Sequence, residues 1–416
     1  MSNPLNTNIT PISDKLEQGK DRARIFQEFL AIANSPNATT DNPALLYKGV
    51  QTSPYQQDIN NYPVRLKDQQ NLEELLFQPY PKVGELPQIA SQGLEFIHPD
   101  IKEACICIGR LADDKIKAHW MGRNALNKNQ FWSGTKIIPL LNIVSQLNTK
   151  FPDIDIDNCV IVDTDNPQKY VSFFNAANDI VSYQNKIASS NSLAAMCKRF
   201  ETWEGLELWV KKITGNQDLI FRGRYGEVPY INQPRLYDVK TKKILLKAAP
   251  ETTRGDNLVT AYDLVRFISM LGWHHHLLPQ SRLPGAQWNS LEAIVRAMGS
   301  DACRYIDVAI QALGLEKVVT SPTIISKLGN GFSDSRQSSE IVYIALVQFL
   351  DERPKVNNNP PVLRTVSMAL RGVKPFQETN PDKIEAAQKR DAIELDARMA
   401  AEVTEILRRV ITEELV

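Results

Sequence analysis

Residues 131–144 read FWSGTKIIPLLNIV, and this stretch indicates how the chain folds. From Ile137 onward almost every side chain is apolar, whichever side of a helix it would occupy. A helix that is apolar all round is buried on all sides. We therefore predict a central, buried helix that begins close to Ser133 and around which the other elements pack.

Strand patterns precede this helix. Residues 104–109 (ACICIG) are continuously apolar, and residues 116–120 (IKAHW) alternate between apolar and polar side chains. Residues 112–115 (ADDK) between them are mostly polar, as is typical of a turn. These segments predict a β-hairpin.

Strand patterns return near residue 320. Residues 323–327 and 340–347 are rich in β-branched residues, and the glycines of the GNG segment at 329–331 predict a turn after the first strand. The region between about Pro152 and Gly314 predicts mostly helices. One of these helices begins at Thr260, with Asp263 completing a capping-box arrangement.

Strands at both ends of a helical middle predict an α+β fold. In such a fold, distant segments form one antiparallel sheet that packs against a helical part, here about residues 133–314. We place this catalytic domain at residues 93–350. Residues 1–92 predict a partly irregular extension with one helix at about 21–33. Residues 351–416 predict a C-terminal segment whose helix, from about residue 382, buries Leu395, Met399, Val403, Ile406 and Val410.

Composition narrows the class of partner. The chain has 416 residues, 43% of them hydrophobic, and its 48 Lys and Arg balance its 48 Asp and Glu. This balance gives no electrostatic footprint for nucleic acid, and no basic helix predicts contact with a membrane surface. The expected partner is a small molecule or a peptide-like substrate. With neither a signal-like start nor a long apolar run, the expected location is the cytoplasm.

The thiols and imidazoles predict neither disulfides nor a metal site. The five cysteines are scattered without Cys-x-x-Cys spacing, at positions 105, 107, 159, 197 and 303. Three consecutive histidines, residues 274–276, point in different directions on any regular element and have no accompanying ligand cluster. We therefore predict buried thiols, no metal and no cofactor.

Ser133 and Lys136 are the first candidates for chemistry. At a separation of three residues their side chains share one face of a helix. A serine becomes a good nucleophile when an adjacent base takes its proton, and a desolvated lysine can be that base. The alternative is an ordinary helix start, with an N-cap serine and a lysine in the first turn.

Two further motifs follow this pair. Ser189-Ser190-Asn191 stands 56 residues after Ser133, and Lys327-Leu328-Gly329 stands 194 residues after it, between two predicted strands. The segment 182–185 (SYQN) competes for the middle motif. Measured from Ser182, its asparagine comes one place too late for Ser-x-Asn spacing.

Over residues 95–350 the chain resembles serine β-lactamases and penicillin-binding proteins, most nearly the class A β-lactamase type. The resemblance rests on the series Ser-x-x-Lys, Ser-x-Asn and Lys-x-Gly in this order. It implies that Ser133 forms an acyl-enzyme and that Lys136 accepts its proton. It also implies that Ser189 relays a proton to the leaving group and that Asn191 holds the substrate amide and Lys136.

The same resemblance assigns the third motif to substrate binding. Lys327 would supply positive charge to a substrate carboxylate and to Ser189. Gly329 would border the substrate, and the backbone N–H groups of Ser133 and Asn330 would form the oxyanion hole. Trp132, beside the nucleophile, would wall the pocket or pack in the core.

Three positions qualify the resemblance. Leu328 stands where the family has Thr or Ser, which removes a hydroxyl expected to bind a substrate carboxylate. Arg336 could replace that interaction or be an exposed turn arginine. Glu227 is the candidate base for deacylation, although its spacing to Asn232 is five residues rather than the usual four.

The resemblance therefore predicts a serine hydrolase acting on an amide or ester, β-lactam or peptide-like. A D,D-peptidase, an esterase or a biosynthetic acyltransferase would use the same residues. A catalytically silent binding module is the alternative from a different class.

Overall fold

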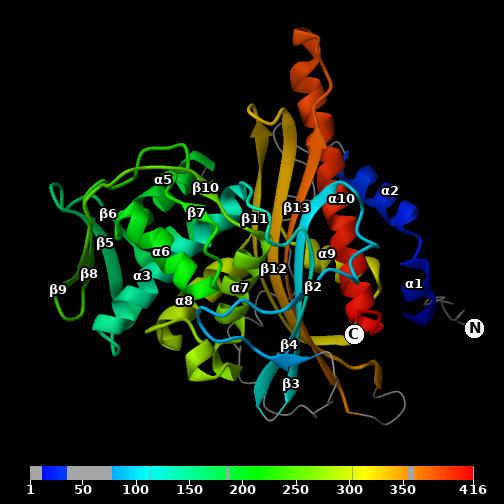
Figure 1. Cartoon of the computed structure of the whole chain (residues 1–416), viewed down its shortest axis with the longest axis horizontal. Helices are drawn as coiled ribbons and strands as arrows, with labels where there is room; N and C mark the ends of the chain where they lie inside the picture. The colour runs from blue at the N-terminus through cyan, green and yellow to red at the C-terminus, as the bar shows by residue number, and fades with distance from the viewer. Residues whose placement is uncertain are drawn as a thin grey trace, which may run out of the picture.

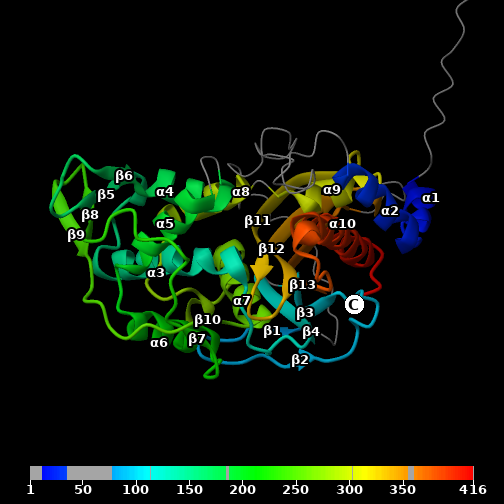
Figure 2. The ribbon, with the colours of Figure 1, turned by 90° about the horizontal axis from the view of Figure 1, so that it is seen from above.

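A long, twisted sheet with helices on both faces forms the centre of the molecule (Figure 1). The computed structural model describes residues 12–34, 77–112, 114–183, 187–301, 303–354 and 360–415, except for the side chains of residues 187 and 188. Viewed from above, the helices that contain residues 137–299 lie on one side of the sheet. On the other side α10 (Ile384–Ile411) lies with α1 (Ile12–Gln18), α2 (Arg22–Ala33) and α9 (Tyr305–Ala312) (Figure 2).

Seven strands of the described residues form this sheet, in the order β1-β4-β3-β13-β12-β11, with β2 also paired to β4. All pairs are antiparallel except β2 with β4. The strands are β1 (Gln78–Pro79), β2 (Ile89–Ala90), β3 (Ile101–Ala112), β4 (Lys115–Arg123), β11 (Val319–Ser333), β12 (Ser338–Asp351) and β13 (Val362–Pro375). The predicted hairpin and the predicted sheet of distant segments are confirmed.

Alternation along β12 explains why both faces of the sheet are covered. Val342, Ile344 and Leu346 belong to one hydrophobic cluster, and the intervening Tyr343 and Ala345 belong to another. Successive side chains of a strand point to opposite faces. A strand that is apolar on both faces needs helices on both, and α7 (Ala261–Gly272) and α10 supply them.

Helices and a second sheet form the part between β4 and β11. The helices are α3 (Ile137–Lys150), α4 (Phe173–Ser182), α5 (Ile187–Lys198), α6 (Trp203–Thr214), α7 (Ala261–Gly272), α8 (Trp288–Gly299) and α9 (Tyr305–Ala312). Every α3 side chain from Ile137 to Ser145 is buried, which confirms the predicted central helix. The prediction of a mostly helical region missed a two-stranded pair, β7 (Ile220–Phe221) with β10 (Asn257–Leu258), and an antiparallel sheet in the order β6-β5-β8-β9. The strands of this second sheet are β5 (Cys159–Asp163), β6 (Tyr170–Ser172), β8 (Pro234–Asp238) and β9 (Lys243–Lys247).

The start of α7 follows the predicted capping box. The Asp263 backbone N–H donates to Thr260 Oγ1 at 3.1 Å, and the Thr260 backbone N–H donates to Asp263 Oδ2 at 2.9 Å. Both residues are completely buried, and burial raises the pKa of Asp263 to about 6. These reciprocal bonds satisfy N–H groups that a helix start otherwise leaves unpaired.

The predicted domain boundaries at residues 92 and 350 do not follow the sheet. At the N-terminal end, β1 and β2 pair with β4, so residues 77–92 are part of the sheet. At the other end, β13 lies between β3 and β12, and the C-terminal helix α10 (Ile384–Ile411) packs on β12 and β13. The predicted C-terminal segment therefore contributes a central strand and the helix that covers it.

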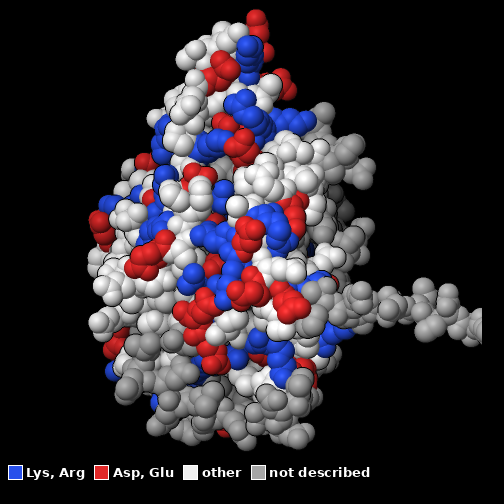
Figure 3. Space-filling view, turned by 90° about the vertical axis from the view of Figure 1, so that its right-hand side faces the viewer, with Lys and Arg blue, Asp and Glu red and all other residues white. Residues whose placement is uncertain are grey.

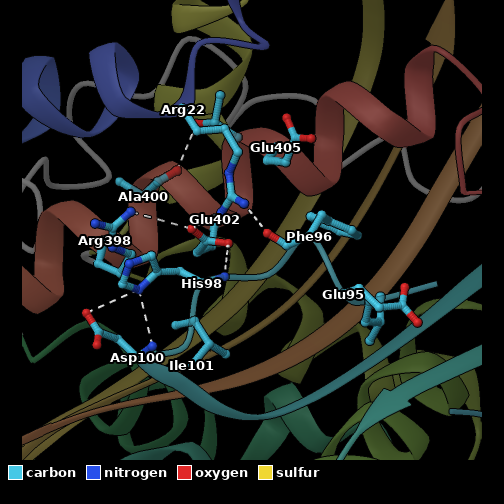
Figure 4. A network of polar contacts seen from close by, with 12 residues as sticks. Arg22, Glu95, Phe96, His98, Asp100, Ile101, Arg398, Ala400, Glu402 and Glu405 are labelled. Atoms are coloured by element: carbon cyan, nitrogen blue, oxygen red, sulfur yellow. Dashed lines mark hydrogen bonds and ion pairs between the residues drawn. The ribbon is translucent and has the colours of Figure 1, made fainter. Parts of the chain in front are cut away.

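Two helices of the predicted N-terminal extension pack near α10. They are α1 (Ile12–Gln18) and α2 (Arg22–Ala33), so the predicted helix near residues 21–33 is confirmed. A buried carboxylate, Glu402 of α10, connects two other parts of the chain (Figure 4). It forms an ion pair with Arg22 of α2, and it accepts the backbone N–H of His98, just before β3, at 3.0 Å. Burial raises the pKa of Glu402, and the Arg22 guanidinium opposes that rise.

Charges of both signs are interspersed over the face formed by α2 and α10 (Figure 3). This face offers no broad region of one sign. Each of the described helices is too short or too polar to cross a membrane. The five cysteines are all buried and free, as predicted.

The predicted turn at residues 329–331 is wrong, because this segment continues β11 and the turn follows Ser333. The glycines are needed for close packing instead. A Cβ atom on Gly329 would lie 2.7 Å from the backbone nitrogen of Ser133, and one on Gly331 would lie 2.7 Å from the Trp132 ring. The segment that carries Ser133 therefore packs directly on the backbone of β11.

Replacing Gly329 with alanine should destabilise the protein by about 2 kcal/mol, because the new methyl group meets backbone atoms that cannot move aside independently. Urea unfolding would measure the change in unfolding free energy. Gly255→Ala is the control, because its nearest neighbour is a side-chain atom 3.3 Å away. Equal unfolding free energies for the two variants would contradict the role assigned to Gly329.

Candidate active site

Ser133 lies in a short 3₁₀ helix, Trp132–Lys136, that runs into α3. The prediction placed Ser133 at the start of the α-helix itself, which begins four residues later at Ile137. Residues three apart are aligned in a 3₁₀ helix, so Ser133 and Lys136 still share a face. Ser133 is partly exposed, and among the described residues its hydroxyl has no hydrogen-bond partner, Lys136 included.

The residue before Ser133 has an unusual backbone conformation. Trp132 has a φ of 41°, a region that bulky L-residues rarely adopt. Its indole nitrogen donates to Glu340 Oε2 at 2.8 Å. Glu340 is buried and also accepts hydrogen bonds from Arg371 and Arg336, which hold its pKa below the ordinary value against the effect of burial. This bonding fixes the Trp132 side chain while the backbone turns toward Ser133.

Lys136 is completely buried. Its Nζ donates to Ser190 Oγ at 3.0 Å and lies 5.5 Å and 5.8 Å from the ring centroids of Tyr183 and Tyr225. Burial lowers the pKa of Lys136 well below its ordinary value, and the positive charge of Lys327 lowers it further. A lysine with a lowered pKa is neutral over a wider pH range than an exposed lysine, and the neutral amine can accept a proton.

Lys327 approaches the same region from β11. Its Nζ lies 3.7 Å from the Tyr183 ring centroid and donates to the carbonyl oxygens of Leu328, at 2.9 Å, and Val181, at 3.2 Å. Burial lowers the pKa of Lys327 to about 7, and the charge of Asp301 partly opposes this. The fold thus brings two predicted residues, Lys136 and Lys327, near the ring of one tyrosine.

The serine that contacts Lys136 is Ser190, not the predicted Ser189. Ser190 Oγ accepts from Lys136 and donates to the Ile180 carbonyl at 2.9 Å, whereas Ser189 Oγ donates to Asp179 Oδ2 at 2.7 Å. Consecutive residues of a helix point about 100° apart, so only one of them can face Lys136. The helical phase of α5 selects Ser190.

Two more predicted polar residues, Asn191 and Glu227, form no hydrogen bond or ion pair with either lysine in the part of the chain that the structure describes. Asn191 is half-buried on α5, and in the described part of the chain it forms no hydrogen bond with Lys136. Glu227 is half-buried in the loop after β7, and it forms no ion pair with either lysine there. That loop is attached to α5 through Ser192, whose Oγ donates to the Val228 carbonyl at 2.7 Å.

The third motif places its side chains on two faces of β11. Leu328 belongs to the hydrophobic cluster on the α10 side, so the hydroxyl that the family pattern would place here would not face Lys136. Asn330 is exposed and pairs with Ile341 of β12. Arg336, in the turn after β11, is paired with Glu340 at 2.7 Å and 3.0 Å rather than standing free.

Tyr183 and Ser190 were missed as site residues. Tyr183 adopts the left-handed conformation at the end of α4, with φ of 55°, and its hydroxyl donates to the Leu328 carbonyl at 2.7 Å. Tyr183 belongs to the segment 182–185 (SYQN), which was considered for the middle motif. That segment was set aside only because its asparagine comes one place too late when counted from Ser182. Asn185 of that segment lies outside the described residues.

No cluster of His, Cys, Asp or Glu side chains in the described residues is arranged to hold a metal ion. His274 and His276 are buried in a short 3₁₀ helix, and burial lowers the pKa of both.

No protein-family model and no curated protein match this chain. Solved structures that match include a β-lactamase from Desulfarculus baarsii DSM 2075, with 15% identity, coverage of 70% of this chain and 91% of that one, and a TM-score of 0.37. Another is a β-lactamase from Streptosporangium roseum, with 11% identity, coverage of 76% and 96%, and a TM-score of 0.41. At this level of similarity, the function has to be argued from the residues of this chain.

The Lys327→Met substitution should raise the pKa of Lys136, because it removes a neighbouring positive charge. Asp179→Asn should lower the pKa of Lys136, because it removes a negative charge that opposes the effect of burial. Selective isotope labelling of lysine and NMR titration of the Nζ groups would measure both. Lys128→Met, a change at a surface ion pair, is the control, and an unchanged Lys136 pKa in the Lys327 variant would refute the coupling.

Proposed function

We propose that this protein is a serine acyl-transfer enzyme that acts on an amide or ester through an acyl group on Ser133. The observation that carries the proposal is the buried amine of Lys136, which has a lowered pKa, shares the 3₁₀ turn with Ser133 and contacts Ser190. A buried lysine without a carboxylate partner is costly to a fold. A role of Lys136 as proton acceptor would explain why the protein buries it at that cost.

In the proposed acylation step, Ser133 Oγ attacks the substrate carbonyl carbon and its proton passes to neutral Lys136. Rotation of the Ser133 side chain or one bridging water would connect the two groups. The backbone N–H groups of Ser133 and Asn330 would stabilise the oxyanion. Ser190 would then carry the proton from Lys136 toward the leaving group, in the role first predicted for Ser189.

Tyr183 fits the proposal because its ring lies near both lysine amines. The Lys327 amine lies over the ring, and the Tyr183 hydroxyl donates to the Leu328 carbonyl. Lys327 would also attract a substrate carboxylate. Arg336 is less available for that task, because Glu340 already occupies its guanidinium.

The acceptor in the second step defines the type of enzyme. With Glu227 activating a water molecule the protein would be a hydrolase, and Asn191 would position the substrate amide. With another nucleophile it would be an acyltransferase. A protein that keeps this arrangement without forming an acyl group would be a binding module.

A fluorophosphonate probe should label the wild-type protein on one residue, and Ser133→Ala should remove the label. The labelling rate should rise with pH through the lowered pKa of Lys136, because only the neutral amine accepts the serine proton. Mass spectrometry of the labelled peptide and labelling rates at several pH values would check both points. Absence of label on the wild type, by this probe and by fluorescent penicillin, would refute the acyl-enzyme proposal.

Adjacent serines provide a matched test of the site geometry. Ser190→Ala should slow labelling by about tenfold or more, because it removes the contact to Lys136. Ser189→Ala should change the rate little, because that hydroxyl binds Asp179. If Ser189→Ala slowed labelling more than Ser190→Ala, the proton relay would belong to Ser189, as first predicted.

Trp132→Phe should slow labelling at saturating probe while leaving the probe concentration at half-maximal rate nearly unchanged. The substitution keeps the ring but removes the hydrogen bond to Glu340, so the Ser133 turn loses its alignment. Trp273→Phe is the control, because it removes an indole hydrogen bond to Thr365 elsewhere in the core. Similar losses in thermal stability with similar labelling rates would show that Trp132 has only a structural role.

A further inference from the structure

The second sheet has an apolar outer face. Its strands are β5 (Cys159–Asp163), β6 (Tyr170–Ser172), β8 (Pro234–Asp238) and β9 (Lys243–Lys247), at the left of Figure 1. The inner side chains, including Ile161 and Leu236, are completely buried. A sheet with one buried face normally carries polar residues on the other.

Here the outer positions are mostly apolar as well. Val160, Tyr237 and Ile244 form a row across three strands, with direct pairing at each step. Val162 and Tyr170 face each other beside that row, and Tyr170 and Ile244 are 60% and 42% exposed. Apolar side chains clustered on a solvent-facing surface are typical of a binding site.

These side chains line a cavity of about 530 Å³. The volume lies within the range of small-molecule sites, and such sites combine an apolar surface with a few polar groups. The cavity is built from β5, β8 and β9, so it is separate from the turn that carries Ser133.

The polar end of the cavity favours an anion. Arg235 lines it and uses its Nε to donate to Thr164 Oγ1 at 2.9 Å. Its two terminal nitrogens form no hydrogen bond or ion pair with any described residue. Lys247 stands opposite Arg235 on β9, whereas the one acid of the lining, Asp163, accepts the Asp165 backbone N–H at 3.1 Å. A guanidinium with two free nitrogens binds a carboxylate through paired hydrogen bonds.

We propose that this cavity is a second ligand site that binds an organic carboxylate with an apolar body, of the size of a medium-chain fatty acid. The carboxylate pairs with Arg235, and the apolar body lies along Val160, Tyr237 and Ile244. The site is independent of acyl transfer at Ser133.

Isothermal titration of the full chain with decanoate tests the proposal, with 1-decanol as the uncharged analogue. Decanoate should bind about tenfold more tightly than decanol, because only the carboxylate pairs with Arg235. Arg235→Gln should remove that difference and leave decanol binding unchanged. Ile244→Asn should weaken the binding of both ligands, because it removes apolar contact area from the lining of the cavity.

Two controls locate the binding. Arg254→Gln, at an arginine that is 48% exposed in an ion pair with Glu251, should bind decanoate like the wild type. Ser133→Ala should also bind decanoate normally, and loss of binding in that variant would place the ligand at the serine turn and overturn the proposal. Absence of decanoate binding, or equal affinity of wild type and Arg235→Gln, would overturn it too. Sedimentation could also overturn the proposal. It would do so if the wild type were a dimer and only the Ile244→Asn variant were a monomer, because a second copy of the chain would then cover this face.

Discussion

Backbone packs directly on backbone where the Ser133 turn meets β11, and the arrangement of the site depends on this contact. Two glycines on one face of β11 make the approach possible, because no Cβ atom separates the strand from the turn. This close approach also brings the charge of Lys327 near enough to Lys136 to lower its pKa. Any larger residue at 329 would push the Ser133 turn and β11 apart, because its Cβ atom would lie 2.7 Å from the Ser133 nitrogen.

The electrostatic character of the site follows from this packing. Two lysine amines are buried near one tyrosine ring, and burial is the main cause of the lowered pKa of each. Asp179 and Asp301 oppose the lowering from a distance without forming ion pairs with the amines. The protein thus lowers the pKa of both amines instead of pairing them with carboxylates, which suits proton transfer better than it suits stability.

Features with local causes were predictable from sequence, and features set by packing were not. The apolar run after Ile137, the Thr260–Asp263 cap and the spacing of Leu395 and Met399 each act within a few residues, and the structure has all of them. The choice of Ser190 over Ser189 depends on where α5 begins and how it rotates. The strand through Gly331 looked like a turn because glycine serves both turns and close contacts, and sequence does not separate the two uses.

The position of β13 links the order of synthesis to the architecture. This strand is the last of the sheet to be made, yet it lies in its middle, between the β3–β4 hairpin and the β11–β12 hairpin. Until residues 362–375 emerge from the ribosome, both hairpins carry an open edge of unpaired backbone groups. The two hairpins can therefore be joined into one sheet only after this strand has been made, and the helix that covers it follows directly in the chain.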